Sequence, residues 1–154
     1  MSYARVDTPL GPIGLWWEGE TLTRVDLEPD PDRQRSQDIP PESVTRQLGR
    51  YFADGQGTFD LPLALAGTQF QRRVWSLMRA IPPGETRTYG SIAGELGSAA
   101  RAVGQACRAN PLPIVVPCHR VVGAKGLGGF AGDTSGRKLE VKRWLLRHEG
   151  AQVQ

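Results

Sequence analysis

Apolar and polar residues alternate along the first thirty positions of the chain, a period of two that is typical of strands with one buried side. Two strands are predicted from the apolar positions Ile13, Leu15 and Trp17, then Leu22, Val25 and Leu27. Glu18-Gly19-Glu20 lies between them and predicts a hairpin turn. From about Glu42 to Ala53 the apolar spacing becomes helical. The sequence therefore predicts a small antiparallel sheet followed by a helix.

The segment from residue 28 to residue 42 interrupts this pattern, because it is polar and rich in proline. It predicts an irregular loop. Asp54-Gly55-Gln56-Gly57 ends the predicted helix, and the residues from 59 to 65 predict a short extended segment. We therefore expect an amino-terminal α/β scaffold domain at residues 1–66 and a second domain at residues 67–154.

The second domain opens with a helix signal. Thr68 is followed three residues later by Gln71, which matches a capping box. Pro82-Pro83-Gly84 ends this helix. Trp75 is expected at the edge of the apolar stripe, which consists of Phe70, Val74, Leu77, Met78 and Ile81.

Two further short helices are predicted next. The first runs from Tyr89 to Leu96 with Gly97 as its C-cap, and the second runs from an N-cap at Ser98 to about Ala109. Two short helices joined through a glycine turn are typical of a helix-turn-helix. Val103 and Cys107 of the second helix are expected to face inward, and the outward positions include Ala100, Ala102, Gly104 and Gln105.

Gly104 needs a reason, because glycine in a helix interior costs about 1 kcal/mol relative to alanine. One reason is the close approach of a DNA backbone, since small residues let a helix enter a narrow groove. The other is tight packing against a neighbouring helix. The spacing alone favours neither.

The apolar run Ile114-Val115-Val116 predicts a short buried strand that delivers Pro117-Cys118-His119-Arg120. A cysteine beside a histidine is a nucleophile beside a titratable base, which indicates a reactive site. Adjacent residues of a strand point to opposite faces, so Cys118 and His119 can cooperate only through a turn or a bridging water.

Glycines are dense from residue 123 to residue 132, which leaves backbone groups free to line a ligand; a plain flexible loop is the other interpretation. A last helix is predicted from about Ser135 to Glu149, packing Val141, Trp144, Leu145 and His148. The fold class is therefore α+β: a small antiparallel sheet with a helix, then a mostly helical carboxy-terminal domain with a helix-turn-helix and an active-site strand.

The composition indicates the cellular compartment in which the protein is expected. The 154 residues contain no stretch of 18 apolar residues, and the first residues lack the apolar core of a signal peptide. We expect a soluble cytoplasmic protein in which Cys107 and Cys118 are free thiols.

The two predicted domains differ in charge. Residues 1–66 carry six arginines and eleven acidic residues, a net charge of minus five. Residues 67–154 carry thirteen basic and five acidic residues, plus eight, which suits a polyanionic partner.

Three stretches of the second domain carry a resemblance to a known family: Arg101-Ala102-Val103-Gly104, Arg108-Ala109-Asn110-Pro111, and the run from Pro113 to Val122 around Cys118. They resemble the O6-alkylguanine-DNA alkyltransferases, DNA-repair proteins that accept an alkyl group on a cysteine. The resemblance is close from about residue 67 to residue 150 and looser before that. One difference is the turn at residues 96–99, which is about two residues shorter than is usual in the family and lacks its proline.

The resemblance implies roles at the reactive site. Cys118 accepts the alkyl group, Glu149 holds His119 in one tautomer, and a water joins His119 to Cys118. Asn110 supports the turn between the recognition helix and the active-site strand. The loop after Cys118 closes over the flipped guanine, with substrate contacts at Val121, Phe130 and Ala131.

The resemblance also implies a DNA-binding mode. The recognition helix enters the minor groove, and Arg101 fills the gap that the flipped base leaves. Tyr89 helps to rotate the 3' phosphate and protonates the leaving guanine. The expected DNA contacts are Arg101, Ala100, Ala102, Gly104, Gln105 and Arg108. The expected partner is double-stranded DNA with O6-alkylguanine, and O4-alkylthymine as a further lesion. The protein is expected to be a monomer, with cooperative binding on DNA left open, and no cofactor or metal is implied.

Three other classes of protein compete with this interpretation. A cysteine hydrolase would use the same Cys, His and Glu, but hydrolase activity would not explain the two basic helices. A non-catalytic lesion-recognition protein of the alkyltransferase-like type would lack the acceptor cysteine, which is present here. A zinc protein is disfavoured because residues 107, 118, 119 and 148 do not have the usual C-x-x-C spacing.

Overall fold

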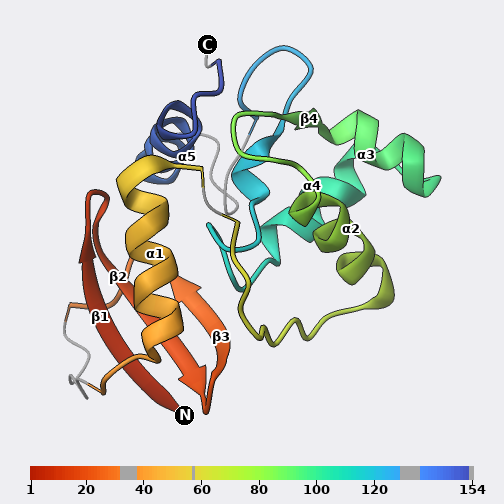
Figure 1. Ribbon diagram of the computed structural model, residues 1–154. Coiled ribbons are helices and arrows are strands. Elements are labelled where there is room, and N and C mark those ends of the chain that lie inside the picture. Colours follow the sequence, from red (N-terminus) through yellow and green to blue (C-terminus); the bar gives the residue numbers. More distant parts are fainter. Residues whose placement is uncertain (32–37, 57, 129–135, 153–154) are drawn as a thin grey trace. The chain divides into compact units, whose positions relative to one another are not determined.

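A computed structural model describes residues 1–31, 38–56, 58–128 and 136–152. The elements follow the order of three strands, two helices, a short strand, two helices, a 3-10 turn, a short strand and a final helix (Figure 1). Their bounds are β1 Ser2–Thr8, β2 Gly11–Glu18, β3 Thr21–Asp26, α1 Glu42–Asp54, α2 Gln69–Arg79, β4 Arg87–Thr88, α3 Tyr89–Leu96, α4 Ala100–Arg108, η1 Cys118–Arg120, β5 Val121–Val122 and α5 Arg137–His148.

The chain divides into two compact units. Unit 1 contains residues 1–65 together with 111–113, and unit 2 contains residues 66–110 and 114–154. The three residues from 111 to 113 join unit 1 because the Val25 N–H donates to the Pro111 carbonyl at 3.0 Å. Among the described helices, none is long and apolar enough to cross a membrane.

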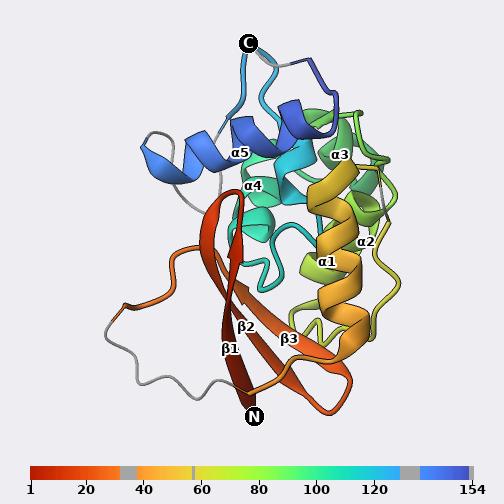
Figure 2. The same cartoon turned by 60° about the vertical axis from the view of Figure 1, so that its left-hand side comes forward.

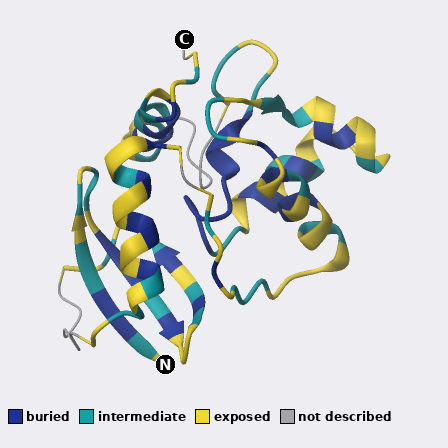
Figure 3. Cartoon of the chain, viewed as in Figure 1, coloured by how far each residue is buried: buried dark blue, intermediate teal, exposed yellow. Residues whose placement is uncertain are grey.

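Unit 1 contains an antiparallel sheet with a helix, as predicted, but the sheet has three strands, and the sequence analysis missed β1. The strands lie in the order β1-β2-β3, and the register of β2 against β3 shifts between Trp16 and Trp17. α1 lies along one face of this sheet in both views (Figures 1 and 2) and turns its buried side toward it (Figure 3). Of the predicted loop at 28–42, residues 28–31 and 38–41 contain no helix or strand, and residues 32–37 lie outside the described ranges.

Unit 2 is built on α2, α3, α4 and α5. The predicted capping box of α2 is confirmed, since the Gln71 N–H donates to Thr68 Oγ1 at 3.1 Å and the Thr68 N–H donates to Gln71 Oε1 at 2.9 Å. The placement of Trp75 at the edge of the apolar stripe was wrong. The side chain is fully buried because its Nε1–H donates to the Ala106 carbonyl at 2.8 Å, which fixes α2 against α4.

The helix-turn-helix is confirmed as α3 and α4. Gly97 ends α3 in the left-handed conformation, with φ of 63°, as predicted. The prediction of Ser98 as the N-cap of the next helix was wrong: α4 begins one residue later, and its N-cap Ala99 has no side chain that can accept a hydrogen bond. The N-terminus of α4 is therefore left without a side-chain cap.

The fold class is confirmed as α+β, but its active-site strand was wrong. Residues 114–116 are buried, yet they lie in turns, and Ile114 has φ of 75°. The apolar run resembles a strand because Ile and Val favour extended backbone. Prolines at 111, 113 and 117 remove backbone donors, so a ladder cannot form there. The only strand of this segment among the described residues is the two-residue β5, which pairs parallel with β4.

Candidate functional site

Cys118 is positioned by a tight turn. The Val116 carbonyl accepts the Cys118 N–H at 2.8 Å across Pro117, whose φ of −83° and ψ of 69° are those of an inverse γ-turn. The same carbonyl accepts the Asn110 side-chain N–H at 2.8 Å. Asn110 thus ties the end of α4 to the residue before the turn.

A 3-10 helix, η1, begins at Cys118 itself. Successive side chains of a 3-10 helix are about 120° apart, whereas those of a strand point to opposite faces. The backbone turn therefore removes the geometric objection to cooperation between Cys118 and His119. Both side chains are buried.

The next two residues of η1 bind one carboxylate. His119 Nε2 lies 2.7 Å from Glu149 Oε2. Arg120 donates through Nε to Glu149 Oε1 at 2.8 Å and through NH2 to Oε2 at 3.0 Å, while its NH1 donates to the Ile81 carbonyl at 2.7 Å. All of these groups are buried, so each charge depends on the others for its solvation.

Glu149 is ionised in this cluster. Burial acts to raise the pKa of its carboxyl, but the hydrogen bonds from His119 and Arg120 and the charge of Arg120 lower it to about 2. Burial lowers the pKa of His119 from its ordinary value, so the imidazole is neutral. A neutral imidazole that faces a carboxylate through Nε2 carries its proton there. The lone pair is then on Nδ1, which is buried and has no hydrogen-bond partner among the described residues.

The thiol of Cys118 is protonated at rest. Its exposed fraction is only 4 %, and burial raises its pKa to about 11. A hydrogen bond from the Asn110 side chain, the charge of Lys142 and the backbone N–H of Cys118 act in the opposite direction. A thiolate at this position therefore needs a group that takes the proton.

Lys142 is the functional candidate that the sequence analysis missed. It is fully buried, and its Nζ donates to the Val121 carbonyl at 2.7 Å and to the Leu127 carbonyl at 2.5 Å. Burial lowers the pKa of Lys142 to about 8. The signal was in the helical spacing, because Lys142 precedes Leu145 by three residues and so shares the apolar side of α5. Arg120 was also given no role, although it follows directly on the reactive pair.

Tyr89 lies on the same side of the site as Lys142. Lys142 Nζ is 3.5 Å from the Tyr89 hydroxyl and 5.6 Å from the centre of its ring. Burial, followed by the nearby thiols, raises the pKa of Tyr89, so the phenol keeps its proton. Gly128 has φ of 72°, and a Cβ there would lie 2.8 Å from the Tyr89 ring. The backbone after β5 can approach the tyrosine this closely because residue 128 has no side chain.

The candidate DNA-contacting residues lie on α4. Arg101, Ala100, Gln105 and Arg108 are exposed, and Ala102 and Gly104 are half-buried. A Cβ added at Gly104 would meet no atom within 4 Å. Tight packing against a neighbouring helix is therefore not seen at this glycine among the described residues, and the close approach of a DNA backbone stays a prediction.

The remaining predicted residues fall into three groups. Val121 is buried in β5, and its carbonyl is held by Lys142. Phe130 and Ala131 lie outside the described residues. Cys107 is buried with its sulfur 3.5 Å from that of Met78, and its raised pKa of about 12 is a consequence of burial. In the part of the chain that the structure describes, no group of His, Cys, Asp and Glu could hold a metal ion.

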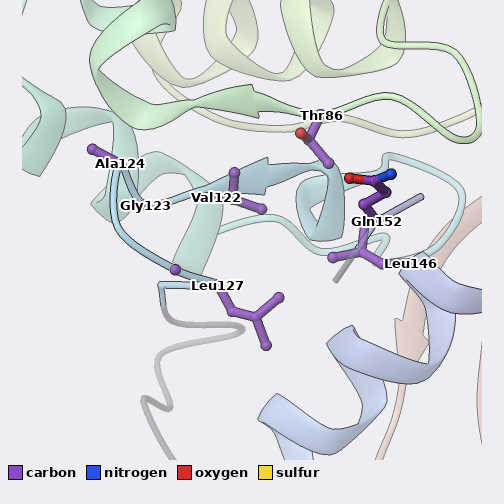
Figure 4. Close-up of a pocket in the computed structure, with 8 residues that line it drawn as sticks. Thr86, Val122, Gly123, Ala124, Leu127, Leu146 and Gln152 are labelled. Carbon is purple, nitrogen blue, oxygen red and sulfur yellow. The ribbon is translucent and has the colours of Figure 1, made fainter. Parts of the chain in front are cut away.

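A pocket of about 150 Å³ opens beside β5 (Figure 4). The loop after β5 forms one of its walls, and α5 and the chain end form others. Its described lining does not include Cys118, so it is not the space around the acceptor sulfur. The lining residues are Thr86, Val122, Gly123, Ala124, Gly126, Leu127, Leu146 and Gln152.

Comparison with known proteins defines the class. Residues 69–151 match the family model for the DNA-binding domain of 6-O-methylguanine DNA methyltransferases, and residues 1–65 match the model for the ribonuclease-like domain of the same proteins. The chain therefore belongs to the 6-O-methylguanine DNA methyltransferase family. The resemblance found in the sequence is confirmed, and the protein is an enzyme of the transferase class.

Individual relatives agree over the full length. A methylated-DNA–protein-cysteine methyltransferase of Methanosarcina acetivorans is 44% identical, with 98% of this chain and 99% of the relative aligned. Another from Mycolicibacterium paratuberculosis is 46% identical, covering 99% and 97%. The crystal structure of Mycobacterium tuberculosis O6-methylguanine methyltransferase superimposes with a TM-score of 0.81 at 42% identity over 96% of this chain and 92% of that one. A structure of OGT from the same organism in complex with DNA gives 0.79 at 43% identity, with the same coverage.

Proposed function

We propose that the protein repairs duplex DNA by transferring the alkyl group of O6-alkylguanine to Sγ of Cys118, once per molecule, with the damaged base flipped out through the minor groove. The observation that carries this proposal is the arrangement around Cys118. A buried thiol begins a turn whose next two side chains hold a buried carboxylate, within a chain of the methyltransferase family.

Proton transfer follows from the tautomer of His119. Glu149 accepts the Nε2 proton, so Nδ1 is the basic atom of the ring and takes the thiol proton of Cys118, directly or through one water. Arg120 keeps Glu149 ionised and in place and so acts as a positioning residue. Lys142 and Asn110 supply positive charge and a hydrogen bond that favour the thiolate as it forms.

The bonds that form and break explain why each protein molecule reacts only once. The thiolate attacks the alkyl carbon, a carbon–sulfur bond forms, and the bond between that carbon and guanine O6 breaks with its electron pair left on guanine. The proton that left the thiol replaces the alkyl group on the base, so the atoms balance. Tyr89 keeps its phenol proton and is a donor beside the leaving base. The thioether has no hydrolytic route back, unlike the thioester of a cysteine hydrolase.

The outer face of α4 supports DNA as the partner. Its small residues and the open space at Gly104 suit a helix that approaches a backbone closely. Arg101 is exposed near the start of α4, where it can fill the place of a flipped nucleotide. Flipping costs a few kcal/mol, which the pocket and the inserted arginine offset.

The test is the mass of the intact protein after incubation with a duplex that contains one O6-methylguanine, followed by peptide mapping. We expect a gain of one methylene mass on Cys118 that saturates at one per protein. Cys118→Ser should abolish the gain and leave duplex binding intact, and the matched control Cys107→Ser should transfer normally. No gain in the wild-type protein, with tight binding to the duplex, would move the protein to the lesion-recognition class. A duplex with O4-methylthymine extends the same assay to the second lesion.

A further inference from the structure

Three arginines on α2 have no part in the site around Cys118. Arg72, Arg73 and Arg79 are all exposed, and α2 contains no acidic residue. Within the described ranges, none of the three guanidinium groups makes a hydrogen bond or an ion pair. We call these three residues the α2 arginine strip; Arg72 and Arg79 share one face of α2, and Arg73 lies about 100° around the helix from Arg72.

Some other arginines of the described chain have protein partners, whereas Arg24, Arg101, Arg143 and Arg147 have none among the described residues, so what distinguishes α2 is that three such arginines lie on one helix without an acid. The groups that the partnered arginines contact are a carboxylate on the same helix, a backbone carbonyl, a glutamate of α3 and the buried glutamate of the site. The pairs are Arg46 with Glu42 at 3.5 Å, Arg50 with the Thr58 carbonyl at 2.8 Å, Arg87 with Glu95 at 3.1 Å, and Arg120 with Glu149 at 2.8 Å. The α2 strip is a set of neighbouring cations that the protein itself leaves without a counter-charge.

The strip is fixed to the helix that is proposed to bind DNA. Trp75 of α2 donates to the Ala106 carbonyl of α4, and the sulfurs of Met78 and Cys107 are 3.5 Å apart. Neither helix has an acidic residue in its first turn, so neither helix offsets the positive N-terminal end of its own dipole. Two packed helices therefore present arginine charge and no acid, which complements a polyanion.

We propose that the α2 arginine strip binds backbone phosphates of the same duplex that α4 engages, outside the groove that α4 enters. The proposal rests on the proposed function in one respect, that the partner is DNA. Arg72 and Arg79 are seven positions apart, which is about 10 Å along a helix. Phosphates of one strand are spaced about 3.4 Å along the duplex axis, so Arg72 and Arg79 span about three such steps and can make two phosphate contacts from one face.

The test is the salt dependence of duplex binding by the triple variant R72Q/R73Q/R79Q. Each phosphate contact contributes about −0.9 to the slope of log K against log salt concentration. The triple variant should therefore lose about two units of slope and bind at least tenfold more weakly at low salt. The matched control is R24Q/R46Q/R50Q, which removes three exposed arginines of unit 1 and the same net charge. Equal slopes for the two triple variants would overturn the proposal.

Two further readouts separate this proposal from the proposed function. Alkyl transfer to Cys118 at saturating duplex should be the same in R72Q/R73Q/R79Q and the wild-type protein, because the strip touches no group of the site. Absent transfer in the wild-type protein would refute the proposed function while the comparison of slopes still stands. A duplex that ends at the groove occupied by α4 should show no difference between the triple variant and the wild-type protein. A full difference on that short duplex would contradict phosphate contacts outside the groove.

Discussion

The interior around Cys118 and the outer face of α4 are separated by only residues 109–117 of the chain. They differ in whether their polar groups are bound by other groups of the protein. In the interior, Glu149, Arg120 and Lys142 are buried, and each binds several protein groups. On the outer face of α4, the N-terminus has no side-chain cap, the first turn has no acid, and Gly104 faces open space. Apart from His119 Nδ1, the protein itself binds the charged groups of this interior, whereas α4 has neither a side-chain cap nor an acid in its first turn.

This difference predicts two kinds of variant. A change in the interior should damage the reaction with any substrate and also lower the free energy of unfolding. A change on the face of α4 should damage only the reaction with duplex DNA, since the reaction of free O6-alkylguanine base with Cys118 needs no contact with that face. Comparing duplex and free-base substrates therefore separates the two regions.

The largest effect is expected from Glu149→Gln. Removing one partner of a buried ion pair leaves Arg120 without its counter-charge, which costs about 3 kcal/mol or more of unfolding free energy. Transfer should fall on both substrates. The pKa of Glu149 is about 2 in the folded protein, below its ordinary value of 4.5, so its stabilisation is present above pH 4.5 and is lost as pH falls toward 2. Chemical unfolding of both proteins between pH 2 and 7 measures this, and a stability gap that does not shrink with acid contradicts it.

Lys142→Met should rank second. It leaves the carbonyls of Val121 and Leu127 without their donor, and each buried acceptor left unpaired costs about 1 to 3 kcal/mol. Loss of the ammonium near Tyr89 should also slow transfer to a similar degree on duplex and free base. Rates on the two substrates, measured at one temperature well below unfolding, test this. A selective loss on duplex would place Lys142 with the DNA-binding face instead.

Arg101→Ala should act on duplex alone. The side chain is exposed, so its removal should change the free energy of unfolding by less than about 0.5 kcal/mol. Flipping costs a few kcal/mol, so transfer from duplex should slow roughly tenfold to a hundredfold while the free-base rate stays unchanged. Single-turnover rates on the two substrates measure the effect, and an equal loss on both would remove the role of Arg101 at the gap.

The smallest effect is expected from Gly104→Ala, and here stability and function should move in opposite directions. Alanine should stabilise the helix by about 1 kcal/mol, because its Cβ meets no atom. Duplex affinity should fall several-fold if a backbone approaches this position. Gly49→Ala in α1 is the matched control, since that exposed helix glycine also has open space around it. It should give the same stabilisation with unchanged DNA binding.

Sequence patterns predicted β2, β3, α1 and the helix-turn-helix well, because these depend on local signals, whereas β1 was missed. The alternation in β2, the Thr68 capping box and the Gly97 C-cap are each contained within a few residues. The family resemblance supplied Glu149 as a partner of His119, since the residues are thirty positions apart and no local pattern joins them.

Two of the failures, at Lys142 and Trp75, have one physical cause, which is that long-range partners decided the outcome. Lys142 resembles a solvated residue of a basic helix until Val121 and Leu127 present their carbonyls to it. Trp75 resembles an edge residue until α4 supplies an acceptor for its indole. The run at 114–116 resembles a strand because its side chains fit one, while the three prolines around it decide the backbone.

At position 114 the left-handed backbone conformation and the buried apolar site favour different amino acids, and no single amino acid suits both. A φ of 75° is a strained conformation for a β-branched residue, and the side chain is nevertheless 1 % exposed. Glycine would relax the backbone but leave a cavity, and asparagine would tolerate the angle but bury an amide. In a saturation library, position 114 should therefore accept few of the nineteen replacements, even though it contacts neither the alkyl group nor DNA in the proposed reaction.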